Sequence, residues 1–298
     1  MMLGKHPNRF WCRIRDMPRF TPATPRSRRL GRELRKLRDA KGLTGDGVAE
    51  IVRCSPSRIS RIESGEIKPR VGDVMELLVA YGVKIDGEPG TSLLEQARGL
   101  REEGWWQRLG GKYATYIAYE TEAVELKNFE PMLVPGLLQT EAYAREVNVI
   151  GRETDPDGVT QRVAARMTRQ EVLHRKPTPL RMHAILSEAS LRTEVGGPDV
   201  LREQLDHLVT LSKLPNVTIQ VLRFEAGAHL ADSSGFVLLA FEPDDPPLGY
   251  IETLAGELFL ESSRDLARLS AAYDNLRTLA RSPAESIKFI RELSEHGA

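Results

Sequence analysis

The stretch SPSRISRIESG, residues 55–65, decides how the amino-terminal part of this chain folds. The Ser55 side chain is suited to accept a hydrogen bond from the first turn of a helix, and Pro56 suits the first helical position because its missing N–H is not needed there. Ile59 and Ile62 recur at helical spacing, and a glycine closes the stretch. The segment therefore predicts a short helix that two isoleucines attach to a core and that is polar on its other sides.

Three more short helices are expected around this one, over residues 27–41, 44–52 and 71–81. Apolar residues recur in them at helical spacing, and Thr44 is a suitable amino-terminal cap for the second. The four helices are tightly linked. The sequence thus predicts a small all-α domain over residues 26–82.

The second and third of these helices have the proportions of a helix-turn-helix, whose second helix lies in the DNA major groove. Residues 30–70 resemble the lambda-repressor and Cro-type family, also called the Xre family, and SRIESG followed by IKPR is the most specific part. By position in that motif, Pro56, Ser57 and Arg61 are expected to face bases, where an arginine can bond guanine O6 and N7 together. The residues expected to contact phosphates are Thr44, Arg58, Lys68 and Arg70.

An acidic residue, Glu63, stands on this helix although DNA would repel it. In related domains the equivalent glutamate pairs with an arginine of the first helix, here Arg38, so the resemblance implies a structural ion pair. Gly45 and Gly47 depart from the family pattern, which has strong helix formers after the capping threonine. Each costs about 1 kcal/mol relative to alanine inside a helix.

The net charge of zero conceals two halves of opposite charge. Up to Gly82 there are 18 Lys and Arg against 9 Asp and Glu, and the totals of 42 and 42 leave 24 against 33 for the remainder. A basic head of this kind suits a nucleic-acid partner. The chain has neither an apolar run long enough to span a membrane nor an apolar leader, so we expect a cytoplasmic, nucleoid-associated protein without a membrane partner. Cys12 and Cys54 lack the spacing of a zinc site or a disulfide framework.

The chain is expected to divide into four parts. Residues 1–25 predict a disordered lead-in, 26–82 the helix-turn-helix domain, 83–110 a connecting helix and linker, and 111–298 an α+β domain. Alternating patterns predict strands at 180–188, 216–224, 235–242, 250–254 and 257–262. The patterns predict helices around 115–150, with a break at VPG, and near 159–174, 198–213, 263–279 and 284–293. Several strands are close neighbours in an irregular order, so a mixed, partly antiparallel sheet is expected.

The segment FEPMLVPGLLQTEAYAREV, residues 129–147, resembles part of a set of actinobacterial regulators. These join an Xre-type head to a carboxy-terminal domain of uncharacterised activity that is WhiJ-like or antitoxin-like. The resemblance implies that this domain senses a ligand or a small protein encoded nearby. Aromatic residues and a long loop supply a candidate ligand or partner surface, with core packing as the alternative explanation. Its residues are Trp105, Trp106, Tyr113, Tyr116 and His229.

An enzyme in the second domain is the alternative from a different class. His229, Asp232 and Ser233 include the residue types of a nucleophilic triad, but they are crowded together and lack a Gly-x-Ser-x-Gly elbow. The histidines lack metal-site spacing, and no phosphate-binding glycine loop is present. We therefore expect no catalytic residues, no metal and no cofactor.

The sequence favours a sequence-specific DNA-binding transcriptional regulator. Because one head covers little DNA, a homodimer on two half-sites is expected. The main alternative is an antitoxin-like protein that chiefly binds a small neighbouring protein and autoregulates its operon.

Overall fold

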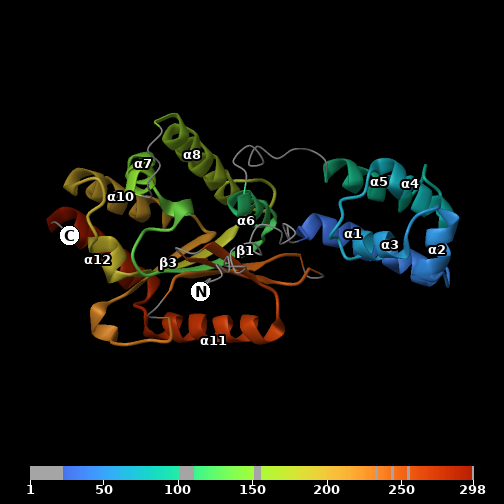
Figure 1. Ribbon diagram of the computed structural model, residues 1–298. Coiled ribbons are helices and arrows are strands. Elements are labelled where there is room, and N and C mark those ends of the chain that lie inside the picture. Colours follow the sequence, from blue (N-terminus) through green and yellow to red (C-terminus); the bar gives the residue numbers. More distant parts are fainter. Residues whose placement is uncertain are drawn as a thin grey trace, which may run out of the picture.

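The computed structural model describes residues 23–100, 111–150, 156–231, 234–242, 245–253 and 256–296. A helical unit lies at one end of the molecule and a larger α+β unit at the other (Figure 1). The helical unit contains α1 (Pro25–Ala40), α2 (Gly45–Ile51), α3 (Pro56–Glu63), α4 (Val71–Ala80) and α5 (Gly90–Gly99). Most of the segment predicted as a disordered lead-in, residues 1–22, lies outside the described residues.

Local sequence signals set where the first three helices begin. Thr24, Thr44 and Ser55 stand at the N-cap positions of α1, α2 and α3, and each side chain accepts a hydrogen bond from the backbone N–H three residues later. Pro25 and Pro56 occupy the first turn of α1 and α3. The α2 and α3 helices therefore begin at the predicted caps, whereas α1 begins at Pro25, slightly before the expected start at residue 27.

An apolar core connects the five helices of the helical unit. Leu30 and Leu34 of α1 and Ile59 and Ile62 of α3 are at most 2% exposed. The sequence assigned residues 83–110 to a connecting helix and linker, but α5 packs into this same core. Its contributing residues are Leu93, Leu94 and Ala97, followed by Leu100.

Two glycines allow α1 to approach α3 closely. A Cβ atom at Gly31 would lie 2.4 Å from the backbone oxygen of Glu63, so only a residue without a side chain fits there. Gly65, which closes the opening stretch, has φ +79° and would place a Cβ atom 2.7 Å from the backbone nitrogen of Arg28. This glycine therefore ends α3 in a left-handed conformation and also permits the contact with α1.

The α+β unit contains a six-stranded mixed sheet in the order β3-β2-β1-β4-β5-β6. The β1, β2 and β3 strands are parallel, and β4, β5 and β6 add to the β1 edge in antiparallel fashion. The strands are β1 (Glu125–Glu130), β2 (Arg181–Ser187), β3 (Val217–Leu222), β4 (Phe236–Ala240), β5 (Leu248–Thr253) and β6 (Gly256–Leu260). The expectation of an α+β domain with a mixed, partly antiparallel sheet is confirmed.

The prediction of helix around 115–150 is wrong for residues 125–130, which form the central strand β1. The segment ELKNFE contains good helix formers, and Asn128 and Glu130 break its apolar alternation. In the fold, β1 pairs with β2 on one side and β4 on the other. This pairing outweighs the local helix propensity, because a strand's stability depends on its neighbours.

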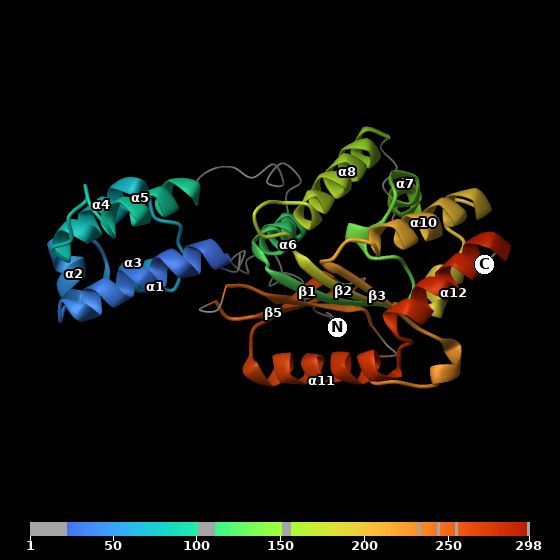
Figure 2. The same cartoon turned by 180° about the vertical axis from the view of Figure 1, so that it is seen from behind.

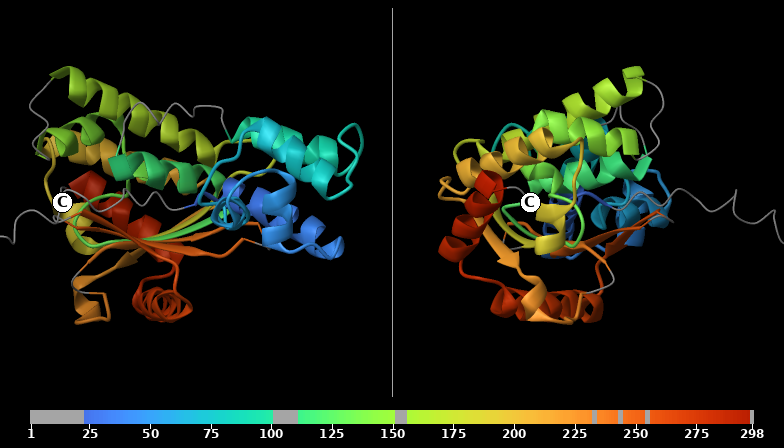
Figure 3. Two further views of the ribbon diagram at one scale, coloured as in Figure 1. Left: turned by 45° about the vertical axis from the view of Figure 1, so that its right-hand side comes forward. Right: turned by 90° about the vertical axis from the view of Figure 1, so that its left-hand side faces the viewer.

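Helices cover both faces of the sheet. One face carries α6 (Gly111–Glu122), α7 (Glu141–Ile150), α8 (Pro156–Arg169), α10 (Pro198–Leu211) and α12 (Pro283–His296), while α11 (Ser263–Leu279) lies on the other (Figures 2 and 3). Leu126 of β1 belongs to the core of the first face and Phe129 to that of the second, as strand alternation requires. The predicted helix 159–174 changes to a 3-10 turn after Arg169. Shorter elements are η2 (Gly136–Leu138), η3 (Gln170–Leu173), α9 (Glu188–Arg192) and η4 (Phe224–Ala226).

Candidate functional site

The outer face of α3 is exposed along its leading end. Ile59 and Ile62 are buried in the core of the helical unit, and their burial determines which side of α3 faces outward. The predicted base-reading residues Pro56, Ser57 and Arg61 are all exposed on the opposite side. The structure therefore leaves these three side chains accessible to a partner.

The predicted phosphate-contacting residues flank this helix. Thr44 caps the amino terminus of α2, and the first residues of α2 share a shallow pocket with Pro56 and Ser57 at the start of α3. Lys68 and Arg70 lie exposed between α3 and α4. A helix amino terminus and exposed cations on either side of α3 form a surface suited to a phosphate backbone.

Two arginines of α3 contact acidic side chains of the same unit. The Arg58 guanidinium lies 2.9 Å from the Asp73 carboxylate, which also accepts a hydrogen bond from the backbone N–H of Arg70. The Arg61 guanidinium lies 3.3 Å from the Glu66 carboxylate. The Arg61–Glu66 pair is about half exposed and therefore weak, whereas Asp73 of the Arg58 pair is only 24% exposed.

Glu63 faces inward and pairs with Arg38 of α1. The Nε and Nη2 atoms of Arg38 donate hydrogen bonds of 2.6 and 3.0 Å to the two carboxylate oxygens of Glu63. The Nη1 atom of Arg38 donates to the Leu43 carbonyl at 2.7 Å. The hydrogen bond with Glu63 raises the pKa of Arg38 although burial opposes it. This buried bidentate pair ties α1 to α3, and Glu63 does not point toward the exposed face.

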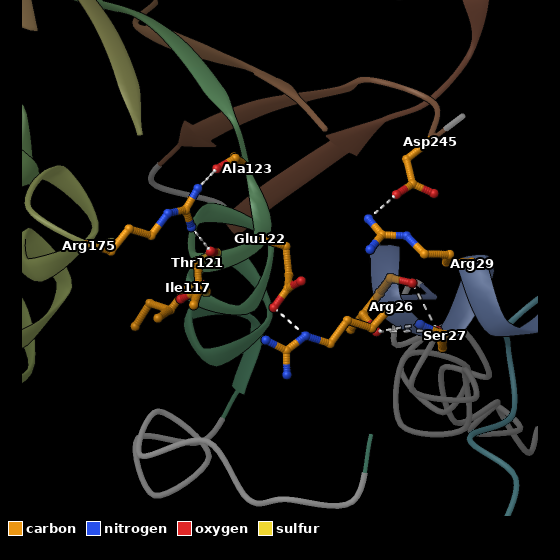
Figure 4. A network of polar contacts seen from close by, with 10 residues as sticks. Arg26, Ser27, Arg29, Ile117, Thr121, Glu122, Ala123, Arg175 and Asp245 are labelled. Atoms are coloured by element: carbon orange, nitrogen blue, oxygen red, sulfur yellow. Dashed lines mark hydrogen bonds and ion pairs between the residues drawn. The ribbon is translucent and has the colours of Figure 1, made fainter. Parts of the chain in front are cut away.

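Arginines at the start of α1 join the helical unit to the α+β unit (Figure 4). Arg26 contacts Glu122 of α6, and Arg29 lies 2.9 Å from Asp245, whose side chain is 1% exposed. Arg32 contacts the same Asp245 carboxylate, and Arg28 contacts Glu261.

A hydrogen bond adds to these ion pairs: the Tyr119 hydroxyl of α6 donates to the Ala23 carbonyl at 2.8 Å. These contacts hold the base of α1 against α6 and the loops that follow β4 and β6.

A cavity in the α+β unit contains one of the aromatic candidates. Tyr116 of α6 is 6% exposed and lines a cavity of about 260 Å³ between the sheet and the helices above it. Polar residues from β1 and α8 share this lining, namely Asn128, Glu130, Arg166 and Arg169. The sequence analysis missed them, although Asn128 and Glu130 occupy alternate positions of β1 that should be apolar in a simple core strand. That pattern is the signal that could have revealed them.

Of the remaining aromatic candidates, the structure describes only the side chain of His229, which does not line this cavity. His229 packs edge-on against Phe129 at 5.4 Å, on the opposite face of the sheet from Tyr116. Trp105 and Trp106, and the side chain of Tyr113, lie outside the described residues. Asp232 and Ser233, which the hydrolase alternative requires, also lie outside the described residues.

Two protein families match the sequence. Residues 29–88 match a helix-turn-helix domain, and residues 113–292 match a domain of unknown function, DUF5753. The second match covers more than half of the 298 residues. The chain belongs to the DUF5753 family. No curated protein matches the sequence. The first match includes α2 and α3 and supports a DNA-binding regulator.

Metal sites and membrane-spanning helices are absent from the described part of the chain. Within it, no group of three or more His, Cys, Asp or Glu side chains is placed to hold a metal ion. Its helices include none that is long and apolar enough to cross a membrane.

Proposed function

We propose that this protein is a sequence-specific transcriptional regulator of the Xre type. Its α3 helix enters the major groove, and its WhiJ-like α+β unit senses a ligand or a small protein. The observation that carries the proposal is the two-sided nature of α3: Ile59, Ile62 and the Glu63–Arg38 pair fix the inner side, while Ser57 and Arg61 are exposed. Such a regulator acts in the cytoplasm, on the nucleoid, and its α+β unit binds rather than catalyses.

Selection of binding sites from random DNA tests this proposal. The full chain is expected to enrich one short motif, arranged as two half-sites about 10–10.5 base pairs apart, or a multiple of that, if it binds as a homodimer. A Ser57→Ala, Arg61→Ala double variant serves as the control and is expected to lose or change the motif. Enrichment of no sequence by the unmodified chain would contradict sequence-specific binding.

A second candidate is an antitoxin-like protein that chiefly binds a small neighbouring protein and autoregulates its operon. A patch of exposed apolar side chains on the helical unit favours a protein partner. Ile51 of α2 and Val79 of α4 are 56% and 66% exposed and line one open concave surface with Met75. Native mass spectrometry of the purified protein is expected to show a stoichiometric small partner that Val79→Asp removes. Partner-free protein with full DNA affinity favours the first proposal.

A further inference from the structure

The cavity of about 260 Å³ lies between the sheet and the layer formed by α6 and α8. Leu126, Met182 and Val237 contribute apolar side chains from three neighbouring strands, and Tyr116 contributes an aromatic ring from α6. Small-ligand pockets usually have volumes of about 300–1,000 Å³. The cavity is close to the lower end of that range and fits a small metabolite better than a peptide.

Two buried polar atoms of the cavity residues have no hydrogen-bond partner among the described residues. One is Oδ1 of Asn128, a side chain that is 3% exposed. The other is Nε of Arg166, whose Nη1 atom donates to Gln139 at 2.7 Å. A buried polar group without a partner is destabilising, so such groups are usually bonded to water or a ligand. Both residues line the cavity, so the cavity is the space from which an occupant could reach this acceptor and this charged donor.

Carboxyl groups lie on the Asn128 side of the cavity. Burial raises the pKa of Glu130 to about 7, with Glu252 raising it further and with Asn128 and Arg166 opposing the rise. Glu252 of β5 also lines the cavity. Acceptors and acidic groups on this side favour a cationic or hydrogen-bond-donating part of a ligand, and an ammonium group satisfies all of them.

The other charged groups of the cavity already satisfy each other. Arg169 donates to both carboxylate oxygens of Glu120 at 2.7 Å, and both side chains are almost fully buried. The Arg169 guanidinium also lies over the Tyr116 ring at 5.3 Å. This pair forms a fixed, neutral wall, which leaves Arg166 as the cation available to an anionic group.

We propose that this cavity binds a free amino acid or a close analogue, with its ammonium group at Asn128 and Glu130 and its carboxylate at Arg166. The apolar floor accommodates the side chain of the bound amino acid. The ammonium group of such a molecule supplies a hydrogen-bond donor for Oδ1 of Asn128, and its carboxylate supplies an acceptor for Nε of Arg166. It also fits the volume of the cavity.

The same helix that lines the cavity contacts the helical unit. Tyr116 and Glu120 of α6 face the cavity, whereas Tyr119 and Glu122 of α6 contact Ala23 and Arg26. Occupation of the cavity can therefore bias how α1 is held. This sensing role rests on the proposed function, whereas ligand binding itself does not.

Calorimetric titration of the full chain with each of the twenty free amino acids tests the site. We expect saturable one-to-one binding of a subset, weakened about tenfold or more by N-acetylation or by loss of the carboxylate, since each removes a charge-assisted hydrogen bond. Arg166→Met should weaken binding about tenfold or more. Arg162→Met, an exposed position on the same helix, should change it less than about twofold. Circular dichroism of each variant checks that it is folded.

The outcomes separate this proposal from the proposed function. Binding by none of the twenty amino acids, or equal binding by the Arg166 and Arg162 variants, would overturn the site. The selection of DNA sites is run with and without the bound amino acid, so DNA binding is measured separately from ligand binding. An amino acid that binds at Arg166 but leaves DNA affinity unchanged would refute the coupling through α6 and retain the site.

Discussion

Two carboxyl groups, Glu63 in the helical unit and Glu130 in the α+β unit, occupy contrasting environments. Glu63 is buried against Arg38, which donates to both of its oxygens. Glu130 lines a cavity, and two other lining residues, Asn128 and Arg166, each keep a polar atom without a partner among the described residues. The helical unit thus pairs its buried carboxylate directly, although the Tyr81 hydroxyl in its core has no hydrogen-bond partner among the described residues. The α+β unit instead leaves polar atoms of two residues that line its cavity unpaired among the described residues.

This contrast is the one expected for the two proposals, DNA binding by the helical unit and small-molecule binding by the α+β unit. A surface that reads DNA needs a rigid support, and a buried bidentate ion pair provides one. A small-molecule site needs convergent polar groups in a concave, partly apolar enclosure. The predictions below test the contrast, beginning with the largest expected effect.

Removing one member of the matched pair should have the largest effect. Glu63→Ala removes two charge-assisted hydrogen bonds from the buried Arg38 guanidinium, which keeps only Asp39 and the Leu43 carbonyl within the described chain, and should lower the free energy of unfolding of the helical unit by about 3 kcal/mol. Hydrogen exchange at the Ile59 and Ile62 amides in the full chain measures this change. Glu66→Ala removes an exposed pair and should cost no more than about 1 kcal/mol. Equal losses would show that Glu63 does not support α3.

Adding a methyl group between α1 and α3 should have the next largest effect. Gly31→Ala places a Cβ atom against the Glu63 backbone and should destabilise the helical unit by about 1–3 kcal/mol. Gly45→Ala is the matched control, because its Cβ atom meets no atom within 4 Å. It should stabilise the unit by about 0.4–1 kcal/mol, since alanine restricts the unfolded chain. Thermal unfolding of both variants gives the comparison, and changes of the same sign would contradict the close approach.

Changes on the outer face should alter DNA binding and leave folding intact. Arg61→Ala should weaken binding to the selected site by about 1–3 kcal/mol and relax the preference at one base position. Lys68→Ala should weaken binding to all sequences alike. It should also reduce the slope of log affinity against log salt concentration by about 1, because one fewer counterion is released. Fluorescence anisotropy at several salt concentrations distinguishes the two. Identical behaviour of both variants would refute the division into base-reading and phosphate-contacting residues.

Glu130→Gln should stabilise the α+β unit in a pH-dependent way. Because the pKa of Glu130 is about 7 in the folded state, the folded chain keeps a proton that the unfolded chain has released at pH values above the ordinary pKa. Stability should therefore fall as pH rises from about 4.5 to about 7 and then level off. The glutamine variant should be about 3 kcal/mol more stable at pH 8 and similar near pH 4. Denaturant unfolding across this range measures the difference, and a constant difference would argue against a neutral Glu130.

Charge composition predicted a basic head, but the fold divides the roles of its cations. Arg26, Arg28, Arg29 and Arg32 contact acidic side chains of the α+β unit. Only some of the Lys and Arg side chains that make residues 1–82 basic therefore lie on the same surface as the exposed side of α3. Counting charges along the chain could not separate docking residues from residues available to DNA, because that separation depends on which unit each side of α1 faces.

The sequence predicted short-range features well. Caps at Thr44 and Ser55 and the isoleucine spacing of α3 each act within one or two helical turns, so their effect could be derived from neighbouring residues. The strand β1 could not be derived in the same way. Its conformation depends on β2 and β4, which are distant in sequence, and its two inward polar residues conceal the alternation.

The sequence by itself determined that α3 is a short capped helix with one apolar side, because capping and helical periodicity are local properties. Only the tertiary structure decided that Asn128 of β1 and Arg166 of α8 line the same cavity and that arginines of α1 hold the α+β unit. Those arrangements arise from sheet pairing and helix packing between remote segments. The physical reason is that burial and charge pairing depend on three-dimensional neighbours, which local sequence patterns do not specify.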